Sequence, residues 1–309
     1  MALTTPCVGL IGLGLVGTAL AQRLRAAGFE VTGFDVRQEA RSAFSELGFQ
    51  VVETCQQVAD AASRICLAVF DTQDVLKVLE GDAVTKGLLN HPEHRGIVRL
   101  VIDCSTGSPE RLEALAARLV TQGIDFIEAP LSGSSQQIEA GEATALLGGS
   151  TEAIARCIDL LQAISPLRFH VGAAGMGARA KLATNLVLGL NRAALAEGMV
   201  FAQGLGIAPV QFLQLVQNSP ANSGAAQAKG DLMVALLKGE AVPAQSRIRQ
   251  HLKDVELMLA AARANGQALP LSETHAALMR EAVRLGEGDL DNAALIHRIA
   301  AAQKPPGAV

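Results

Sequence analysis

The pattern of hydrophobic and polar positions differs between the two halves of the chain. In the first half, short apolar or β-branched runs alternate with stretches of helical periodicity, and this alternation favours βαβ units around a parallel sheet. The predicted strands are residues 7–11, 30–34, 64–69, 97–102 and 124–127. The predicted helices between them are residues 17–27, 37–47, 74–79 and 109–122. We therefore expect an α/β domain over residues 1–172.

The second half reads as helical throughout. Residues 178–205 contain no proline, and the uncharged stretch 182–190 is too long for a strand. This segment predicts one buried helix of about 40 Å that joins two domains. Further helices are expected at residues 209–218, 224–238, 246–264, 271–285 and 291–302. We expect an all-α domain over residues 173–302, for substrate binding and oligomerisation, and a frayed tail over residues 303–309.

Composition excludes several classes of protein. The 309 residues are 50% hydrophobic and 18% charged, with a net charge of -4, which excludes a disordered chain or a polybasic nucleic-acid binder. The chain has no Trp and no Tyr, which argues against base-stacking platforms for single-stranded nucleic acid. We predict no nucleic-acid partner. Broad apolar helices in the second half instead favour a homodimer or a homotetramer.

Three features of the sequence indicate the cellular compartment and whether a metal site is expected. They are the cysteines, the histidines and the N-terminal segment. Five cysteines occur singly without a CxxC pair, as suits a reducing compartment. Six histidines are dispersed without ligand spacing, so we expect surface histidines and no metal site: His91, His94, His170, His251, His275 and His297. The apolar segment 6–22 lacks a basic n-region and is interrupted by glycines, so it is not read as a signal peptide. A cytoplasmic protein without a membrane span is expected.

A glycine fingerprint follows the first predicted strand. Gly12, Gly14 and Gly17 form G-x-G-x-x-G at the start of the first helix, the context in which this pattern predicts a Rossmann-type dinucleotide site. The backbone of such a turn approaches a pyrophosphate closely, and the helix N-terminus favours its charge. The predicted cofactor loop is therefore Gly12, Leu13, Gly14, Leu15, Val16 and Gly17.

Asp35 ends the second predicted strand, 18 residues beyond Gly17. A carboxylate there accepts hydrogen bonds from the ribose hydroxyls and repels a 2′-phosphate, which favours NAD over NADP. Arg37 favours NADP instead if its guanidinium neutralises the 2′-phosphate. The alternative is that Arg37 is a solvated residue in the first turn of a helix.

Lys181 and Asn185 are polar positions near the start of the long apolar helix. A lysine in such a helix is costly unless its ammonium reaches water, a partner or a ligand, and snorkelling to water is the simplest alternative. The two residues are four positions apart, so their side chains share one helical face and can converge on one small polar ligand.

Four ordered segments carry a resemblance that covers nearly the whole chain. They are residues 103–109 (DCSTGSP), 129–134 (APLSGS), 175–185 (GMGARAKLATN) and 251–257 (HLKDVEL). Together they resemble the β-hydroxyacid dehydrogenase family, of the 3-hydroxyisobutyrate dehydrogenase and tartronate semialdehyde reductase type. The resemblance implies an NAD(P)-dependent oxidoreductase that interconverts a small 3-hydroxy acid and its semialdehyde or keto acid, with a cleft between the two domains.

The resemblance also implies roles for individual residues. Lys181 is the general acid and base, and Asn185 orients the substrate. Ser132, Gly133 and Ser134 hold the substrate carboxylate, although Ser134 stands where family members usually have glycine. The implied cofactor contacts outside the glycine loop are Val69, Phe70, Thr106 and Lys253.

This chain departs from the family pattern at three positions, because Ser134, Thr184 and Phe70 each replace the residue that family members usually have there. These departures leave the identity of the substrate open. Two alternatives stay open: an imine or other small-aldehyde reductase on the same scaffold, and a non-catalytic nucleotide-binding protein.

Overall fold

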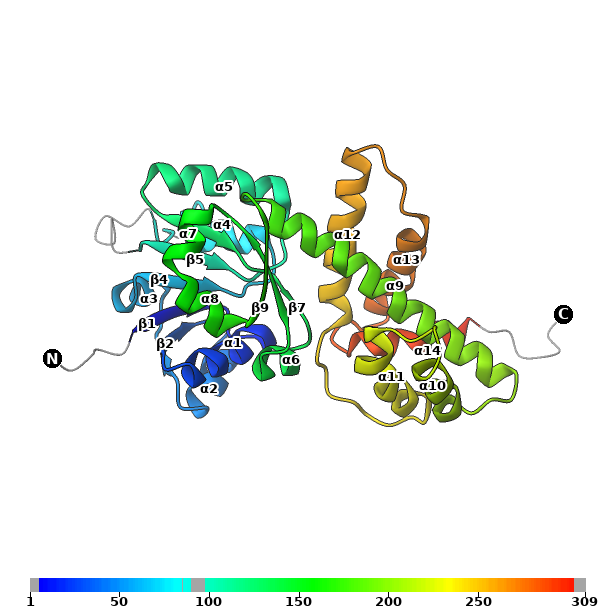
Figure 1. Cartoon of the computed structure of the whole chain (residues 1–309). Helices are drawn as coiled ribbons and strands as arrows, with labels where there is room; N and C mark the ends of the chain where they lie inside the picture. The colour runs from blue at the N-terminus through cyan, green and yellow to red at the C-terminus, as the bar shows by residue number, and fades with distance from the viewer. Residues whose placement is uncertain (1–5, 85, 90–97, 303–309) are drawn as a thin grey trace. The chain divides into compact units, whose positions relative to one another are not determined.

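The computed structural model of the chain describes residues 6–84, 86–89 and 98–302, and it divides into two compact units (Figure 1). The first unit extends to Lys181 and the second begins at Leu182. The division falls inside α9 (Met176–Gly204), the 29-residue helix that the proline-free apolar segment predicts. His91 and His94 lie outside the described residues.

The first unit is built on one sheet, as the alternating pattern predicts. Its order is β3-β2-β1-β4-β5-β6-β8-β7, with β9 paired to β8. Most neighbours run parallel, but the β6–β8 and β7–β8 pairs are antiparallel. The strands are β1 (Cys7–Ile11), β2 (Glu30–Phe34), β3 (Gln50–Val51), β4 (Arg64–Leu67), β5 (Leu100–Asp103), β6 (Asp125–Glu128), β7 (Leu131–Ser132), β8 (Thr144–Gly148) and β9 (Leu167–Gly172).

The sequence pattern misses four of these strands, β3, β7, β8 and β9. Two of them, β3 and β7, are only two residues long and are too short to show a period of two. β9 does alternate apolar and polar residues, with Leu167, Phe169 and Val171 on one side, so its sequence carries a strand signal although Leu167 and Phe169 are exposed. The antiparallel pairs arise in this unpredicted region.

Helices cover both faces of the sheet, and each face has its own apolar core. One core contains side chains of α1 (Leu15–Ala26), α2 (Gln38–Glu46), α6 (Ser135–Ala140), α7 (Thr151–Arg156) and α8 (Ile158–Ile164). The other contains side chains of α3 (Cys55–Ala61), α4 (Thr72–Glu80) and α5 (Pro109–Thr121). Because both faces are covered, the parallel strands read as apolar runs and not as alternating ones.

The second unit is helical, as its periodicity predicts. After α9 it contains α10 (Pro209–Gln217), α11 (Gly224–Leu237), α12 (Ile248–Ala264), α13 (Pro270–Arg284), the 3-10 helix η2 (Asn292–Leu295) and α14 (Ile296–Ala301). These helices share one apolar core. In no helix of the described ranges are length and apolarity together sufficient for crossing a membrane.

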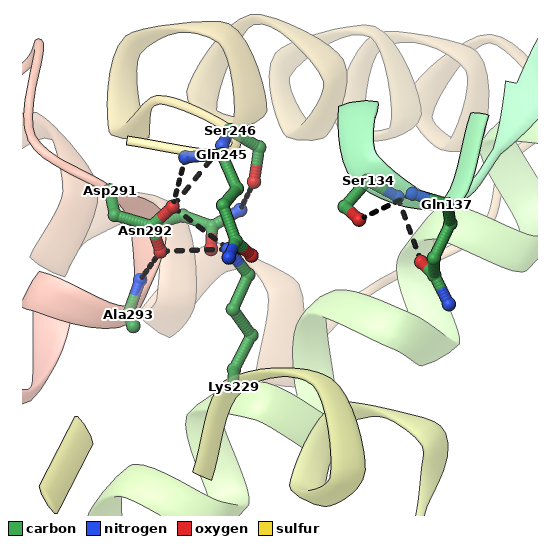
Figure 2. Close-up of polar contacts among 8 residues, drawn as sticks. All are labelled: Ser134, Gln137, Lys229, Gln245, Ser246, Asp291, Asn292 and Ala293. Atoms are coloured by element: carbon green, nitrogen blue, oxygen red, sulfur yellow. Dashed lines mark hydrogen bonds and ion pairs between the residues drawn. The ribbon is translucent and has the colours of Figure 1, made fainter. Parts of the chain in front are cut away.

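A buried ion pair ties three segments of the second unit together (Figure 2). Lys229 of α11 donates to both carboxylate oxygens of Asp291, at 2.9 and 2.8 Å. Asp291 also accepts the backbone N–H groups of Gln245, Ser246 and Ala293. Burial lowers the pKa of Lys229, against the opposing effect of Asp291, and these contacts account for the burial of both charges.

Two histidines correct the expectation of surface positions. His251 of α12 and His275 of α13 are buried, with ring centroids 5.3 Å apart. Space for them comes from Gly189 of α9, where a Cβ atom would lie 2.6 Å from His251 Nε2. Burial and then the charge of Arg192 lower the pKa of His275 to about 4, so its imidazole is neutral at pH 7.

Candidate active site

The glycine fingerprint forms the turn between β1 and α1. Gly12 has φ +95°, and a Cβ atom there would lie 2.3 Å from the carbonyl oxygen of Ala68. At Gly17, a Cβ atom would lie 1.8 Å from the carbonyl oxygen of Gly12. The fold itself therefore requires glycine at the first and third positions of the fingerprint.

Gly14 differs from the other two glycines. It is the N-cap of α1 in an extended conformation, with φ -76° and ψ -165°, that any residue adopts. The nearest atom to a Cβ there would be Arg37 Nη2, at 3.8 Å, which is an ordinary contact. The protein thus leaves open space at a helix N-terminus, where the close approach of a pyrophosphate needs it, so the loop fits a dinucleotide.

Asp35 lies at the end of β2 against this loop. Its carboxylate accepts the backbone N–H of Leu13 at 2.9 Å, and it pairs with the Arg37 guanidinium, whose Nε is 3.1 Å from Oδ1. Burial raises the pKa of Asp35, but hydrogen bonds from Arg37 and Leu13, with the charge of Arg37, outweigh burial and hold the pKa below its ordinary value. The two residues with opposed predicted effects on cofactor choice are therefore in direct contact.

Val69, Phe70 and Thr106 follow the carboxyl ends of two neighbouring strands. Val69 and Phe70 come after β4, and Thr106 comes after β5. Ser105 connects the segments, because its hydroxyl accepts the backbone N–H of Val69 at 3.1 Å. The Phe70 side chain is 42% exposed, which leaves it available to a ligand at this edge of the sheet.

Lys181 lies in α9 and is 7% exposed, so its side chain does not snorkel to water. Its ammonium donates a hydrogen bond to the carbonyl oxygen of Leu131 at 2.6 Å. Leu131 immediately precedes Ser132 and Gly133. The structure thus brings the predicted proton donor to the predicted carboxylate-binding segment, although 50 residues separate Lys181 from Leu131.

Ser134 has a local structural role (Figure 2). Its hydroxyl accepts the backbone N–H of Gln137 at 3.2 Å, and its own backbone N–H donates to Gln137 Oε1 at 2.9 Å. This reciprocal pair is a capping box at the start of α6. The half-buried Ser132 and the exposed Gly133 lie outside that motif.

Asn185 contacts α12 within the second unit. Its amide donates to Asp254 Oδ2 at 3.1 Å, and Lys253 Nζ lies 3.0 Å from Asp254 Oδ1. Asp254 therefore links the predicted substrate-orienting residue to the predicted cofactor contact. No role for Asp254 follows from the residue pattern, because its partner Asn185 is 69 positions away.

Across the described part of the chain, no group of three or more His, Cys, Asp or Glu side chains is arranged to hold a metal ion. The first unit offers polar groups suited to proton transfer and anion binding at Lys181 and Ser132, and a glycine loop suited to a dinucleotide.

Comparison with known proteins gives matches along nearly the whole chain. Residues 7–175 match the family described as the NAD binding domain of 6-phosphogluconate dehydrogenase. Residues 175–299 match the family described as NAD-binding of NADP-dependent 3-hydroxyisobutyrate dehydrogenase.

Full-length relatives agree with these matches. L-threonate dehydrogenase of Cupriavidus necator is 32% identical, over 94% of both chains. 2-Hydroxy-3-oxopropionate reductase of Escherichia coli is 29% identical, over 94% of this chain and 96% of that one. Among solved structures, 3-hydroxyisobutyrate dehydrogenase from Salmonella typhimurium superposes with a TM-score of 0.80 at 25% identity, covering 94% of this chain and 99% of that chain.

Proposed function

The chain belongs to the β-hydroxyacid dehydrogenase family, and from this premise we propose that it interconverts a small 3-hydroxy acid and its semialdehyde or keto acid. As a member it is an NAD(P)-dependent oxidoreductase. The observation that carries the proposal is the buried Lys181 ammonium beside the Leu131–Ser132 segment.

Lys181 is the proposed general acid and base. When bound, the nicotinamide cofactor supplies or accepts the hydride. In reduction, the Lys181 ammonium hydrogen-bonds the substrate carbonyl oxygen and gives it a proton, which leaves an alcohol and a neutral amine. In oxidation, the neutral amine takes the hydroxyl proton. Burial strengthens this interaction because little water competes for the ammonium.

Ser132 and Gly133 are proposed to bind the substrate carboxylate. The half-buried Ser132, with its hydroxyl, and the exposed Gly133 follow the residue that the Lys181 ammonium contacts, and such a combination suits a small anion. Two relatives are named for such acids, L-threonate and 2-hydroxy-3-oxopropionate. We propose that Asn185 orients the substrate from the next turn of α9. The proposed cofactor contacts of Thr106 and Lys253 rest on the family resemblance.

A substrate panel tests the proposal. We expect turnover of NADH or NADPH with small semialdehydes that carry a carboxylate, and weaker turnover with the matching uncharged aldehydes, because these lack the group that Ser132 and Gly133 bind. Oxidation of NADH is followed by its absorbance. Turnover confined to cyclic imines would make the protein an imine reductase, and dinucleotide binding without turnover across the panel would make it a non-catalytic binder.

Cofactor preference gives a second prediction. We expect Asp35→Asn to lower the ratio of kcat/KM for NADH over NADPH at least about tenfold, because a charge that repels the 2′-phosphate is lost while an oxygen stays available to Leu13 N–H. Arg37→Ala is the matched control, and it should preserve or increase the preference for NADH. A wild-type enzyme that already prefers NADPH would contradict the role given to Asp35.

We propose a homodimer or homotetramer in the cytoplasm. Support for association comes from exposed apolar side chains on α9, where Val187 and Phe201 are exposed by 57% and 62%, and from Leu205 just after the helix, exposed by 65%. All five cysteines are free, which agrees with a reducing compartment.

A further inference from the structure

Glu128 is a buried carboxylate at the end of β6 that the mechanism above does not use. The residue is only 1% exposed. Its Oε1 accepts the backbone N–H of Ala178 at 2.9 Å, and its Oε2 accepts the backbone N–H of Gly175. These two N–H groups belong to the start of α9, where a helix has no internal acceptors for its first donors. Glu128 thus anchors the beginning of the helix that carries Lys181.

Two glycines let this helix start approach the sheet closely. At Gly177 of α9, a Cβ atom would lie 2.8 Å from the carbonyl oxygen of Leu146 and 2.9 Å from Glu128 Cβ. At Gly148 of β8, a Cβ atom would lie 2.5 Å from Glu128 Oε2. Backbone therefore packs against backbone around the carboxylate, and the anchor has no room to shift without displacing α9.

The same short segment that anchors the helix also contacts the ammonium. Lys181 lies three residues after Ala178, within one helical turn, so the position of the helix start fixes the position of its side chain. Leu131, which accepts the hydrogen bond from Lys181 Nζ at 2.6 Å, lies three residues after Glu128. Residues 128–131 thereby contact α9 at its backbone and at its proposed catalytic side chain.

We propose that Glu128 is a positioning residue for Lys181, which holds the first turn of α9 so that the ammonium meets the substrate oxygen beside Ser132. This inference rests on the proposed function of Lys181. Glu128 itself transfers no proton to the substrate, because its carboxylate contacts the backbone at the start of α9.

The electrostatic surroundings make the anchor sensitive to pH. Burial raises the pKa of Glu128 to about 7, and the Asp103 carboxylate of β5 adds to the rise. The N–H groups of Ala178 and Gly175 and the Arg179 guanidinium of α9 oppose it. Arg179 is itself paired with Glu113 of α5, at 3.0 Å. Ionised Glu128 accepts both N–H groups strongly, and protonation weakens the anchor as pH falls through about 7.

The effects of Lys181 and Glu128 on the pH profile can be separated by measuring the reaction in the reductive direction. In reduction Lys181 must be protonated, so its own titration removes activity as pH rises. An acidic limb of the kcat profile in that direction is therefore assigned to Glu128. In Glu128→Gln the acidic limb is expected to disappear, because the amide does not titrate.

The experiment compares Glu128→Gln with Glu142→Gln in the reductive direction, from roughly pH 6 to 9. Glu142 makes the matched control because it is exposed and undergoes the same chemical change. We expect Glu128→Gln to lose about tenfold or more in kcat at high pH, since one of two N–H groups then meets an amide donor and Lys181 is displaced. The KM for NADH should stay near wild type, and the thermal midpoint should fall because one buried N–H group loses its acceptor. A purely structural role would lower the midpoint but leave kcat and its pH profile intact.

Further variants keep the inference separable from the proposed function. Glu128→Asp keeps the charge but withdraws the carboxylate by one methylene, and we expect reduced kcat with the acidic limb retained. A wild-type kcat and pH profile in Glu128→Gln, with Lys181→Ala inactive, would overturn the positioning role alone. An active Lys181→Ala would overturn the proposed function. If Glu128→Gln does not fold, a wild-type kcat in Glu128→Asp overturns the inference in its place.

Discussion

Replacing Lys181 with alanine is expected to lower kcat for semialdehyde reduction about 1000-fold, while the affinity for NADH changes little. The size follows from the loss of a positioned proton donor, which contributes about 10² to 10⁴ to the rate of such reactions. The proposed cofactor contacts of the glycine loop and Asp35 lie elsewhere in the sequence and are expected to stay intact. Binding is measured by the fluorescence of NADH, which is convenient because the protein contains no tryptophan.

Two control experiments accompany the Lys181→Ala measurement. Lys181→Met keeps most of the side-chain volume but has no proton to give, so it should be as slow as Lys181→Ala. Small primary amines added to Lys181→Ala should restore part of kcat, because they supply the missing ammonium. Removal of the lysine leaves the buried Leu131 carbonyl without this donor, at a cost of about 1 to 3 kcal/mol in the free energy of unfolding. A folded Lys181→Ala variant with normal kcat would contradict the mechanism.

Gly14→Ala is expected to weaken NADH binding at least about tenfold without unfolding the protein. The backbone at Gly14 is in a conformation that alanine adopts, and a Cβ atom meets nothing closer than 3.8 Å. The added methyl group would occupy the space that a pyrophosphate needs in close approach to the loop. Titration with NADH measures the affinity, and thermal unfolding measures the stability.

Gly17→Ala is the contrasting variant at the other end of the same loop. Its Cβ atom would lie 1.8 Å from the carbonyl oxygen of Gly12, so α1 or the loop must move. We expect a loss of stability of about 3 kcal/mol or more, which outweighs the helix propensity that alanine adds. A Gly14→Ala variant that binds NADH as tightly as wild type would show that the cofactor does not approach this position closely.

The sequence predicts those features of the fold and of the candidate site that depend on local residue patterns. The change from alternating runs to helical periodicity predicts the sheet-based unit, the helical unit and the 29-residue α9, and the structure confirms this fold class. Four short segments in a characteristic order predict the family and the class of enzyme, and the family matches and the full-length relatives confirm both. Local spacing also identifies Gly12 and Gly17, of which Gly17 needs glycine because a Cβ atom would meet the carbonyl oxygen of Gly12 in the same turn, whereas Gly12 has φ +95° and also faces the distant Ala68 carbonyl.

The features that the sequence does not reveal depend on contacts between distant segments. Glu128 anchors backbone N–H groups 47 and 50 residues away, and a lone acidic residue at a strand end gives no sign of such partners. His251 and His275 are buried because Gly189 of another helix makes room for them. Local signals are present at Thr54 and at Ser134, where Gln57 and Gln137, each three residues later, complete capping boxes at the starts of α3 and α6.

The role of Lys181 as proton donor is tested by a crystal structure of the enzyme with NADH and a small 3-hydroxy acid that it turns over. We expect Lys181 Nζ to lie about 3 Å from the substrate hydroxyl oxygen, with the carboxylate against Ser132 and Gly133. A substrate bound with its hydroxyl on another side chain, and with Lys181 beyond hydrogen-bonding distance, would contradict this role.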